Sequence, residues 1–240
     1  MAIPRLAQLL ANARAEGWHQ YVTSSLDEIA LLEGYRFDMQ RARKPLWYFA
    51  NNCRHSKGEW AGKPLLMTEF QSERIIKPLY GWIGPDGRRR FRTLFCFEPK
   101  KQGKSTIAAA IGIYSLDADR LDGKLERGAE IYAAANDKEQ AQQVFGEAMR
   151  MILASPTLRR RLKVFRGTKT ILRDAASWFK ALPCNDATTE GKNAYVVIVD
   201  EIHVFGRKAS AVFNALRYST IARRQPLTVI ITTAGEETLG

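Results

Sequence analysis

Glycine, lysine and two hydroxyl residues follow one another at positions 103–106, Gly-Lys-Ser-Thr. A largely apolar stretch, residues 92–97, comes before them, and a second apolar stretch, residues 107–114, comes after. In the order strand, loop, helix, the backbone amides at the helix N-terminus surround an anion, and the helix dipole favours its charge. Lys104 would reach the β- and γ-phosphates of a nucleotide, and Ser105 would place its hydroxyl on Mg²⁺. The spacing therefore predicts a phosphate-binding loop.

The loop departs from the usual phosphate-loop pattern at one position. Glu98 stands five residues before Gly103, where that pattern has a glycine. A basic loop that only caps a core helix is the alternative interpretation. If the loop does hold a nucleotide, we expect the residues around Gly103 to surround the phosphates: Pro99, Lys100, Lys101, Gln102 and Thr106.

Two acidic residues end a strongly apolar stretch in the second half of the chain. Residues 195–199 read Tyr-Val-Val-Ile-Val, and Asp200 and Glu201 follow. Consecutive β-branched residues predict a buried central strand, and ligands of open α/β sheets bind beyond the carboxyl ends of the strands. Asp200 would hold Mg²⁺ beside Ser105, and Glu201 would polarise the water that attacks the γ-phosphorus. The alternative, that both carboxylates simply face solvent, is disfavoured by the loop upstream.

Two further pairs of residues are candidates for nucleotide contact. Thr232 and Thr233 end an apolar stretch, residues 227–233, where a hydroxyl could sense the state of the γ-phosphate. Far upstream, Gln71 could read adenine through its amide while Phe70 stacks on the base. Each pair has a plain alternative, because threonine is common in strands and a Gln beside an aromatic residue can simply lie on the surface.

Strands alternate with helices over most of the chain, which predicts an α/β fold with a mostly parallel central sheet flanked by helices. Amphipathic patterns predict helices over residues 3–17 and 26–47, with Lys44-Pro45 breaking or kinking the second. We therefore expect a helical N-terminal extension over residues 1–60, packed on an ATPase domain over residues 61–240.

The composition limits the classes of partner and compartment that suit this chain. The chain has 240 residues with a formal net charge of +12, which favours a polyanion, and nucleic acid before a membrane surface. No apolar run has the length of a membrane span, and the N-terminus lacks the apolar core of a signal peptide. Cys53, Cys96 and Cys184 are odd in number and far apart, which indicates free thiols in a reducing compartment. Cys53 and His55 lack a second ligand pair, so a zinc site is rejected.

Basic residues concentrate in one segment, residues 158–173, where two apolar pairs around Gly167 predict a β-hairpin. A solvated charged face and a DNA-contacting surface are both open interpretations. The basic residues of this segment are Arg159, Arg160, Arg161, Lys163, Arg166, Lys169 and Arg173.

Assembled in order, these residues resemble the ATPase domain of the large terminase subunit of tailed bacteriophages. The resemblance runs from about residue 65 to residue 240. The matching pieces are Phe70-Gln71 as an adenine motif, residues 99–105 as a deviant Walker A motif, residues 196–203 as Walker B with its glutamate, and residues 223–235 as a coupling motif. The resemblance implies a P-loop NTPase of the RecA-like type, with an additional strand and a catalytic glutamate.

The resemblance also implies a function and partners. Such a motor hydrolyses ATP with Mg²⁺ and pumps double-stranded DNA through a portal protein into an empty capsid, in the host bacterial cytoplasm, with a small terminase subunit as a further partner. These motors form rings, often pentameric, in which a neighbour's basic residue completes the site. Candidates for that residue are Lys192, Arg207, Arg223 and Arg224.

Lys100 stands where the family carries a basic residue assigned to the γ-phosphate, so it would stabilise charge in the transition state. Thr232 and Thr233 would couple hydrolysis to motion. The family's metal-dependent nuclease domain would follow residue 240, so no nuclease activity is expected from this chain.

Two alternatives to the terminase hypothesis remain open. One is a helicase-like or recombinase-like DNA-dependent ATPase, which would respond to single strands rather than duplexes. The other is a basic DNA-binding assembly module whose nucleotide site is inactive, as Glu98 in the loop would suggest. Intact Lys104, Ser105, Asp200 and Glu201 argue against the second alternative.

Overall fold

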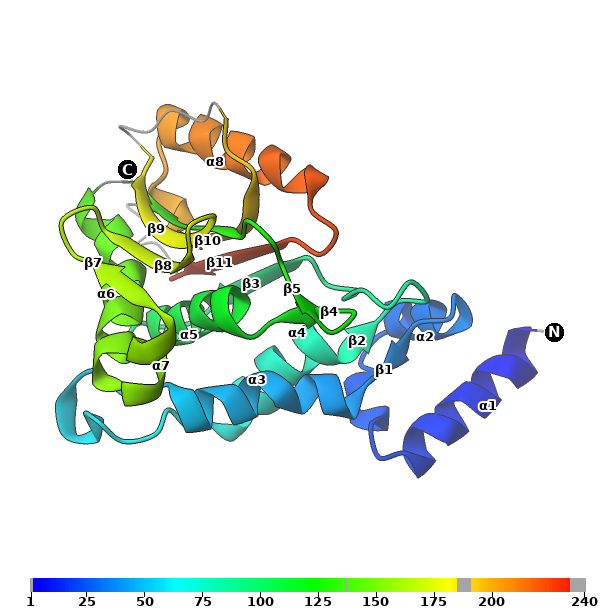
Figure 1. Cartoon of the computed structure of the whole chain (residues 1–240). Coiled ribbons are helices and arrows are strands. Elements are labelled where there is room, and N and C mark those ends of the chain that lie inside the picture. The colour runs from blue at the N-terminus through cyan, green and yellow to red at the C-terminus, as the bar shows by residue number, and fades with distance from the viewer. Residues whose placement is uncertain (1, 137, 185–190, 234–240) are drawn as a thin grey trace. The chain divides into compact units, whose positions relative to one another are not determined.

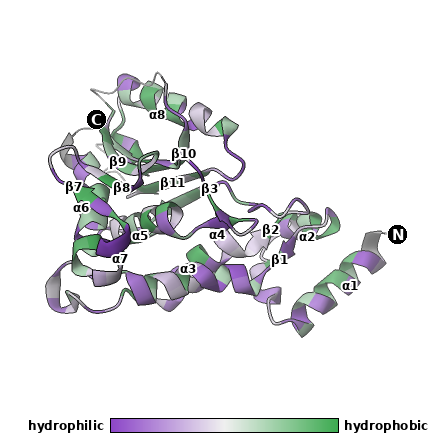
Figure 2. Cartoon of the chain, in the orientation of Figure 1, coloured by the Kyte–Doolittle hydropathy of each residue, from purple (hydrophilic) through white to green (hydrophobic). Residues whose placement is uncertain are grey.

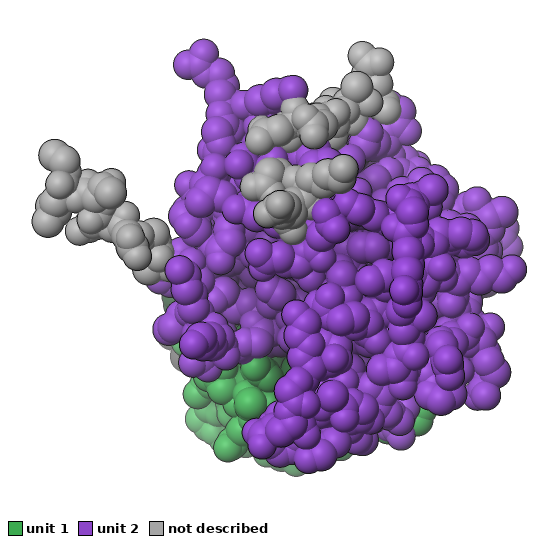
Figure 3. Space-filling model, turned by 90° about the vertical axis from the view of Figure 1, so that its left-hand side faces the viewer, with its two compact units in different colours: residues 1–47, 67–91 green, residues 48–66, 92–240 purple. Residues whose placement is uncertain are grey.

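The computed structural model describes residues 2–136, 138–184 and 191–233 (Figure 1). The chain divides into two compact units (Figure 3). Unit 1 comprises residues 1–47 and 67–91, and unit 2 comprises residues 48–66 and 92–240. The units therefore do not divide at residue 60: residues 67–91 group with the N-terminal helices, and residues 48–66 group with the sheet. Each unit is described by itself below.

Unit 1 is built of short helices around an aromatic core. It contains α1 (Ala2–Ala15), α2 (Ser25–Leu32), the π-helix Gln71–Ile76, α4 (Lys77–Gly81) and the antiparallel pair β1 (Arg36–Phe37) and β2 (Trp82–Ile83). The Phe37 ring stacks on Tyr21 with 4.1 Å between centroids and meets Trp82 edge-on. Such aromatic pairs supply much of the burial of a small core.

The single helix expected over residues 26–47 is wrong. The structure has two helices there, α2 and α3 (Met39–Asn52), with β1 between them. α3 also runs through Pro45 instead of breaking at it, since one proline removes only one hydrogen bond from the helical ladder.

Unit 2 holds a seven-stranded sheet in the order β3-β11-β10-β6-β9-β8-β7. Its strands are β3 (Thr93–Phe97), β6 (Glu130–Ala135), β7 (Lys163–Phe165), β8 (Thr170–Asp174), β9 (Ser177–Pro183), β10 (Ala194–Asp200) and β11 (Leu227–Thr232). The first five in the sheet order are mutually parallel. β8 runs antiparallel to its neighbour β9, and β7 runs antiparallel to β8. A separate hairpin joins β4 (Arg120–Leu121) to β5 (Lys124–Leu125). The predicted α/β fold with a mostly parallel sheet is confirmed.

Helices cover both faces of this sheet (Figure 1). α5 (Lys104–Asp117) and α6 (Lys138–Ala154) lie on one face, and α8 (Arg207–Ser219) lies on the other. Every residue of β10 is buried, and residues 196–199 form an apolar run, as expected for a central strand covered on both faces (Figure 2, coloured by hydropathy). Val197 and Val199 pack toward α8, and Ile198 points to α5. Gly112 of α5 permits this close packing, because a Cβ there would lie 2.7 Å from the Phe179 ring.

The segment with many basic residues is part helix and part hairpin. β7 and β8 form the predicted hairpin, but residues 156–161 form a short helix, α7 (Pro156–Arg161), which Ser155 caps by accepting a hydrogen bond from the Leu158 amide. Two of the basic side chains serve the fold: Arg161 pairs with Asp117, and Arg173 donates to the carbonyls of Leu116 and Glu126.

Among the described residues, no helix has the length and apolar character needed to cross a membrane. The three cysteines are buried free thiols, as predicted.

Candidate active site

The phosphate loop joins β3 to α5 through backbone that favours glycine. Gly103 precedes α5 with φ +77° and Lys101 has φ +70°, both in the left-handed region. At Gly103 this conformation costs little, because glycine has no Cβ. Residues 99–103 are exposed, and Ser105 and Thr106 are half-buried in the first turn of α5. The predicted strand, loop and helix are therefore present.

Lys104 reaches back across the loop. Its side chain is buried, and its Nζ donates to the carbonyls of Glu98 at 2.6 Å and Pro99 at 2.7 Å. These two carbonyls hold the ammonium group inside the curve of the loop. Glu98 therefore contributes its backbone at the position where the usual pattern has glycine, and its backbone amide donates to the Thr232 carbonyl at 3.3 Å.

Asp200 ends β10 at the same edge of the sheet and is 5% exposed. Burial raises the pKa of its carboxyl to about 6, and the neighbouring charge of Glu201 adds to that increase. The charge of Lys104 acts in the opposite direction on this pKa, as expected for an ammonium group at the same edge of the sheet. A buried carboxylate that is hard to ionise alone is a natural ligand for a cation.

Glu201 has a left-handed backbone, φ +51°, which is uncommon outside glycine and asparagine. This conformation accompanies a turn of its side chain toward the end of β11. Glu201 Oε2 accepts hydrogen bonds from the Thr233 amide and the Thr233 hydroxyl, both at 3.1 Å. The Thr232 hydroxyl lies 3.4 Å from the same oxygen. Glu201, Thr232 and Thr233 thus form one connected group.

His203 belongs to this group. The sequence analysis included it in the Walker B stretch, residues 196–203, but gave it no role in the site. Its Nδ1 lies 2.8 Å from the Thr232 hydroxyl and 3.2 Å from Glu201 Oε2. The signal was present as a histidine two residues after the predicted catalytic glutamate. It carried no weight because a lone histidine has many structural roles.

The residues predicted for adenine belong to unit 1, whereas the loop belongs to unit 2. Gln71 and Thr68 form a reciprocal cap: the Thr68 amide donates to Gln71 Oε1, and the Gln71 amide donates to the Thr68 hydroxyl. Thr-x-x-Gln is a capping-box pattern, and the sequence analysis did not consider this interpretation. Phe70 is 57% exposed. The adenine role of both residues stays a prediction, as does the role of Lys100, whose side chain is exposed.

The residues present fit a magnesium ion. Mg²⁺ in nucleotide sites takes one or two protein oxygens and completes its shell with phosphates and water. The Ser105 hydroxyl and the buried Asp200 carboxylate are oxygen ligands of that kind. No group of three or more His, Cys, Asp or Glu side chains in the described part of the chain suits a metal, so a site built from protein ligands alone is not seen there.

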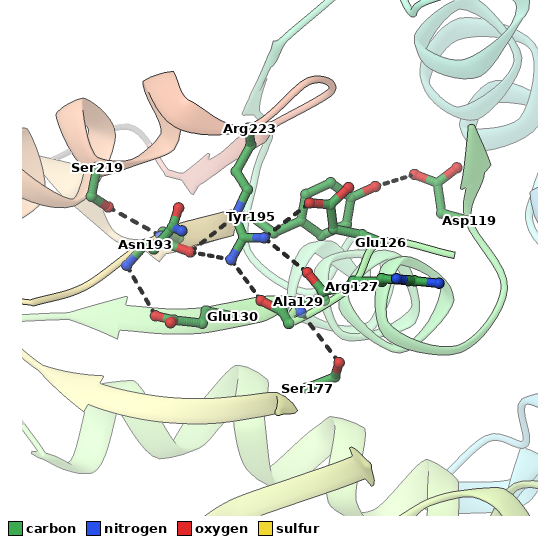
Figure 4. Close-up of polar contacts among 12 residues, drawn as sticks. Asp119, Glu126, Arg127, Ala129, Glu130, Ser177, Asn193, Tyr195, Ser219 and Arg223 are labelled. Atoms are coloured by element: carbon green, nitrogen blue, oxygen red, sulfur yellow. Dashed lines mark hydrogen bonds and ion pairs between the residues drawn. The ribbon is translucent and has the colours of Figure 1, made fainter. Parts of the chain in front are cut away.

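Four basic residues are candidates for the cation that completes the site of a neighbouring copy. One of them, Arg223, is bound by groups of its own chain (Figure 4). The Arg223 guanidinium donates to Glu126 Oε1 at 2.9 Å, to the Gly128 carbonyl at 2.6 Å and to the Asn193 carbonyl at 2.7 Å. Its side chain is 9% exposed. It lies before β11, at the edge of the sheet opposite the phosphate loop. Arg223 therefore joins the starts of β6, β10 and β11, and Lys192, Arg207 and Arg224 remain as candidates.

β11 lies between the loop strand β3 and the carboxylate strand β10. With the glutamate at the end of β10, this order defines a P-loop nucleotide-binding domain of the additional-strand, catalytic-glutamate type. The chain belongs to the family of the terminase large subunit ATPase domain, which matches residues 69–240. The predicted class and family are thus confirmed.

The chain is also similar to two phage large terminases. The chain is 24% identical over 196 residues to the large terminase subunit of Enterobacteria phage HK97, covering 81% of this chain and 37% of that protein. The crystal structure of the HK97 bacteriophage large terminase superimposes with a TM-score of 0.64 at 22% identity over 80% of this chain, which shows a shared fold. The Thermus phage P74-26 large terminase ATPase domain has a TM-score of 0.47 at 16% identity, covering 62% of this chain and 63% of that one. The chain spans little more than a third of the HK97 protein.

Proposed function

We propose that this chain is the motor part of a viral terminase large subunit, which hydrolyses ATP with Mg²⁺ to drive double-stranded DNA into a procapsid. The single observation that carries the proposal is the position of Glu201. It follows the buried strand β10, next to Asp200, and two hydrogen bonds from Thr233 fix its carboxylate. A fixed carboxylate beside a phosphate loop is placed to act as a general base toward water.

Each residue of the site has a role in this proposal. Lys104 and the loop amides bind the phosphates, for which Lys104 exchanges its two carbonyl partners for phosphate oxygens. Ser105 and Asp200 hold Mg²⁺, which when bound neutralises charge between the β- and γ-phosphates. Glu201 takes the proton of the attacking water. Lys100 stabilises charge on the transferred phosphoryl group.

Thr232 and Thr233 connect the hydrolysis step to the rest of the domain. Their hydroxyls contact Glu201, and the Thr232 carbonyl accepts a hydrogen bond from the Glu98 amide of the phosphate loop. A change at the γ-phosphate would therefore alter the hydrogen bonds of β11 and of the phosphate loop together. His203 belongs to the same network through Thr232.

The proposed partners are double-stranded DNA, a portal protein, a small terminase subunit and further copies of this chain in a ring, all in the host bacterial cytoplasm. The net charge of +12 supports a polyanionic partner. Arg161 and Arg173 bond to other parts of the fold, whereas the side chains of five further basic residues do not do so within the described part of the chain. These five supply a DNA-contacting surface on α7 and the β7–β8 hairpin: Arg159, Arg160, Lys163, Arg166 and Lys169.

The proposal is tested by ATP hydrolysis measured with and without Mg²⁺, for the wild type and for Lys104→Ala. We expect turnover that requires Mg²⁺ and falls about 100-fold or more in the variant, because the main cation on the β- and γ-phosphates is gone. We also expect duplex DNA to stimulate turnover more than single-stranded DNA. Stimulation by single strands alone would favour the helicase-like alternative. ATP binding without hydrolysis under every condition would favour an assembly module.

A further inference from the structure

A polar cavity of about 410 Å³ lies beside the first turn of α5. Ser105 and Thr106 of the phosphate loop form one wall of this cavity. The other walls come from α6 and from the segment before the sheet. They are lined by Gln142, Gln143, Glu147, Arg150 and Lys57. All of these residues belong to unit 2. The volume lies within the range of sites that take small molecules.

Arg150 is held in place by neighbouring groups. Its Nη2 donates to Glu147 Oε2 at 2.7 Å, and the other oxygen of Glu147 accepts from the Ser56 hydroxyl at 2.7 Å. Glu147 is almost buried, so this pair is partly shielded from water. Arg150 Nε is buried and has no hydrogen-bond partner among the described residues. The guanidinium is therefore oriented by Glu147, while the Arg150 side chain stays 36% exposed at the wall of the cavity.

The cavity is separate from the groups that would surround the γ-phosphate. Asp200, Glu201, Thr232 and Thr233 stand at the ends of β10 and β11, and none of them lines it. A phosphate loop holds the α- and β-phosphates with its backbone amides, and its serine contacts the metal between the β- and γ-phosphates. A nucleotide whose γ-phosphate lies at Glu201 must therefore extend its other end away from β10. The cavity begins at Ser105 and Thr106, where that end would emerge.

We propose that this cavity receives the α-phosphate and the ribose of the nucleoside triphosphate. Arg150 is the cation that contacts the α-phosphate, and Lys57 adds a second positive charge. Gln143, whose side chain is exposed at the rim, hydrogen-bonds a ribose hydroxyl. This inference rests on the proposed function, because it concerns the same nucleotide.

The test compares ATP affinity by calorimetry and steady-state kinetics for the wild type, Arg150→Ala, Gln143→Ala and a matched control, Arg127→Ala. The Arg127 side chain is exposed at the opposite edge of the sheet. We expect Arg150→Ala to lose roughly tenfold in ATP affinity, as for other hydrogen bonds to charged groups. KM should rise while kcat stays within about twofold, because the contact is made equally in the ground state and the transition state. Gln143→Ala should lose roughly threefold, and Arg127→Ala should match the wild type.

Two results overturn the inference and can be told apart. If the wild type binds ATP while Arg150→Ala and Gln143→Ala bind it equally well, the nucleoside lies elsewhere and the proposed function stands. If the wild type binds no ATP at all, the proposed function fails and this inference fails with it. Should Arg150→Ala lower the melting temperature without nucleotide, Gln143→Ala decides, since its exposed side chain makes no contact on which folding depends.

Discussion

Glu201 combines an unfavourable backbone with a well-fixed side chain. A non-glycine residue at φ +51° costs about 1–3 kcal/mol unless the surroundings compensate. Here the compensation comes from the Glu201 amide, which donates to the Ile231 carbonyl at 2.9 Å, and from the two bonds that Thr233 donates to the carboxylate. Strain held in this way is common at functional sites. It keeps the proposed base at one position relative to the loop.

The ionised Asp200 carboxylate lowers the free energy of unfolding of the chain. The stability of the chain should therefore depend on pH. The pKa of Asp200 is about 6 in the folded chain and near 3.8 when unfolded, so above pH 6 the unfolded state is favoured by the charge. Below the unfolded pKa the carboxyl is neutral in both states, and the penalty vanishes. Asp200→Asn should therefore raise the stability at pH 7.5, without nucleotide or Mg²⁺, by up to about 3 kcal/mol.

This prediction is checked by thermal unfolding between pH 4 and pH 8. The gain in melting temperature should shrink as the pH falls through 6 toward 4. Asp122→Asn is the control, because Asp122 is exposed and its pairing with Arg224 lies at the surface. A variant no more stable than the wild type at pH 7.5 would show that burial does not penalise the Asp200 charge.

At the scale of elements, the sequence was most informative where one physical requirement dominates. Residues 195–199 are apolar and β-branched because β10 is buried on both faces, and this strand was predicted within a residue. The glycine, lysine and serine of the loop likewise predicted that a helix follows, although α5 begins at Lys104, three residues before the apolar stretch 107–114. Where several requirements compete, the helix was not predicted. Examples are the π-helix at Gln71 and α7, whose arginines were read as part of a basic hairpin segment that is either a solvated charged face or a DNA-contacting surface.

Long-range contacts were not predictable from local patterns. Nothing near Arg223 in the sequence indicates that it bonds residues about 30 and 95 positions away, at Asn193 and Gly128. For the same reason the hydrogen bond from the Ser56 hydroxyl to Glu147 was not predicted. The topology of the sheet brings such residues together, and one sequence does not show it.

Arg223 should be a structural residue and not a cation for a neighbour's site. Arg223→Ala leaves the carbonyls of Gly128 and Asn193 and the Glu126 carboxylate without their donor, so we expect a loss of about 3–5 kcal/mol in the free energy of unfolding. Arg224→Ala should change it by less than about 1 kcal/mol, since Arg224 and Asp122 form an exposed pair. Urea unfolding of the two variants measures both effects. If the Arg223→Ala chain is as stable as the wild type but has no ATP turnover, Arg223 is again a candidate for the cation that completes a neighbour's site.

At the scale of the whole molecule, the chain is a nucleotide-binding domain with a second compact unit and a strongly basic charge. It spans 37% of the length of the HK97 large terminase subunit, to which it is similar. In the ring that we propose, a basic residue of a neighbouring copy completes each site. Activity should therefore depend on how many copies meet, and not only on the residues of one copy.

The most direct test of this account is steady-state ATP hydrolysis at increasing protein concentration, for the wild type and for Glu201→Gln. The account predicts turnover per subunit that rises with concentration, and a variant that binds ATP but hydrolyses it about 100-fold or more slowly, as expected for loss of a general base. Glu201→Gln with full ATP turnover would contradict the account, because the carboxylate that the structure fixes beside the phosphate loop would then have no part in the reaction.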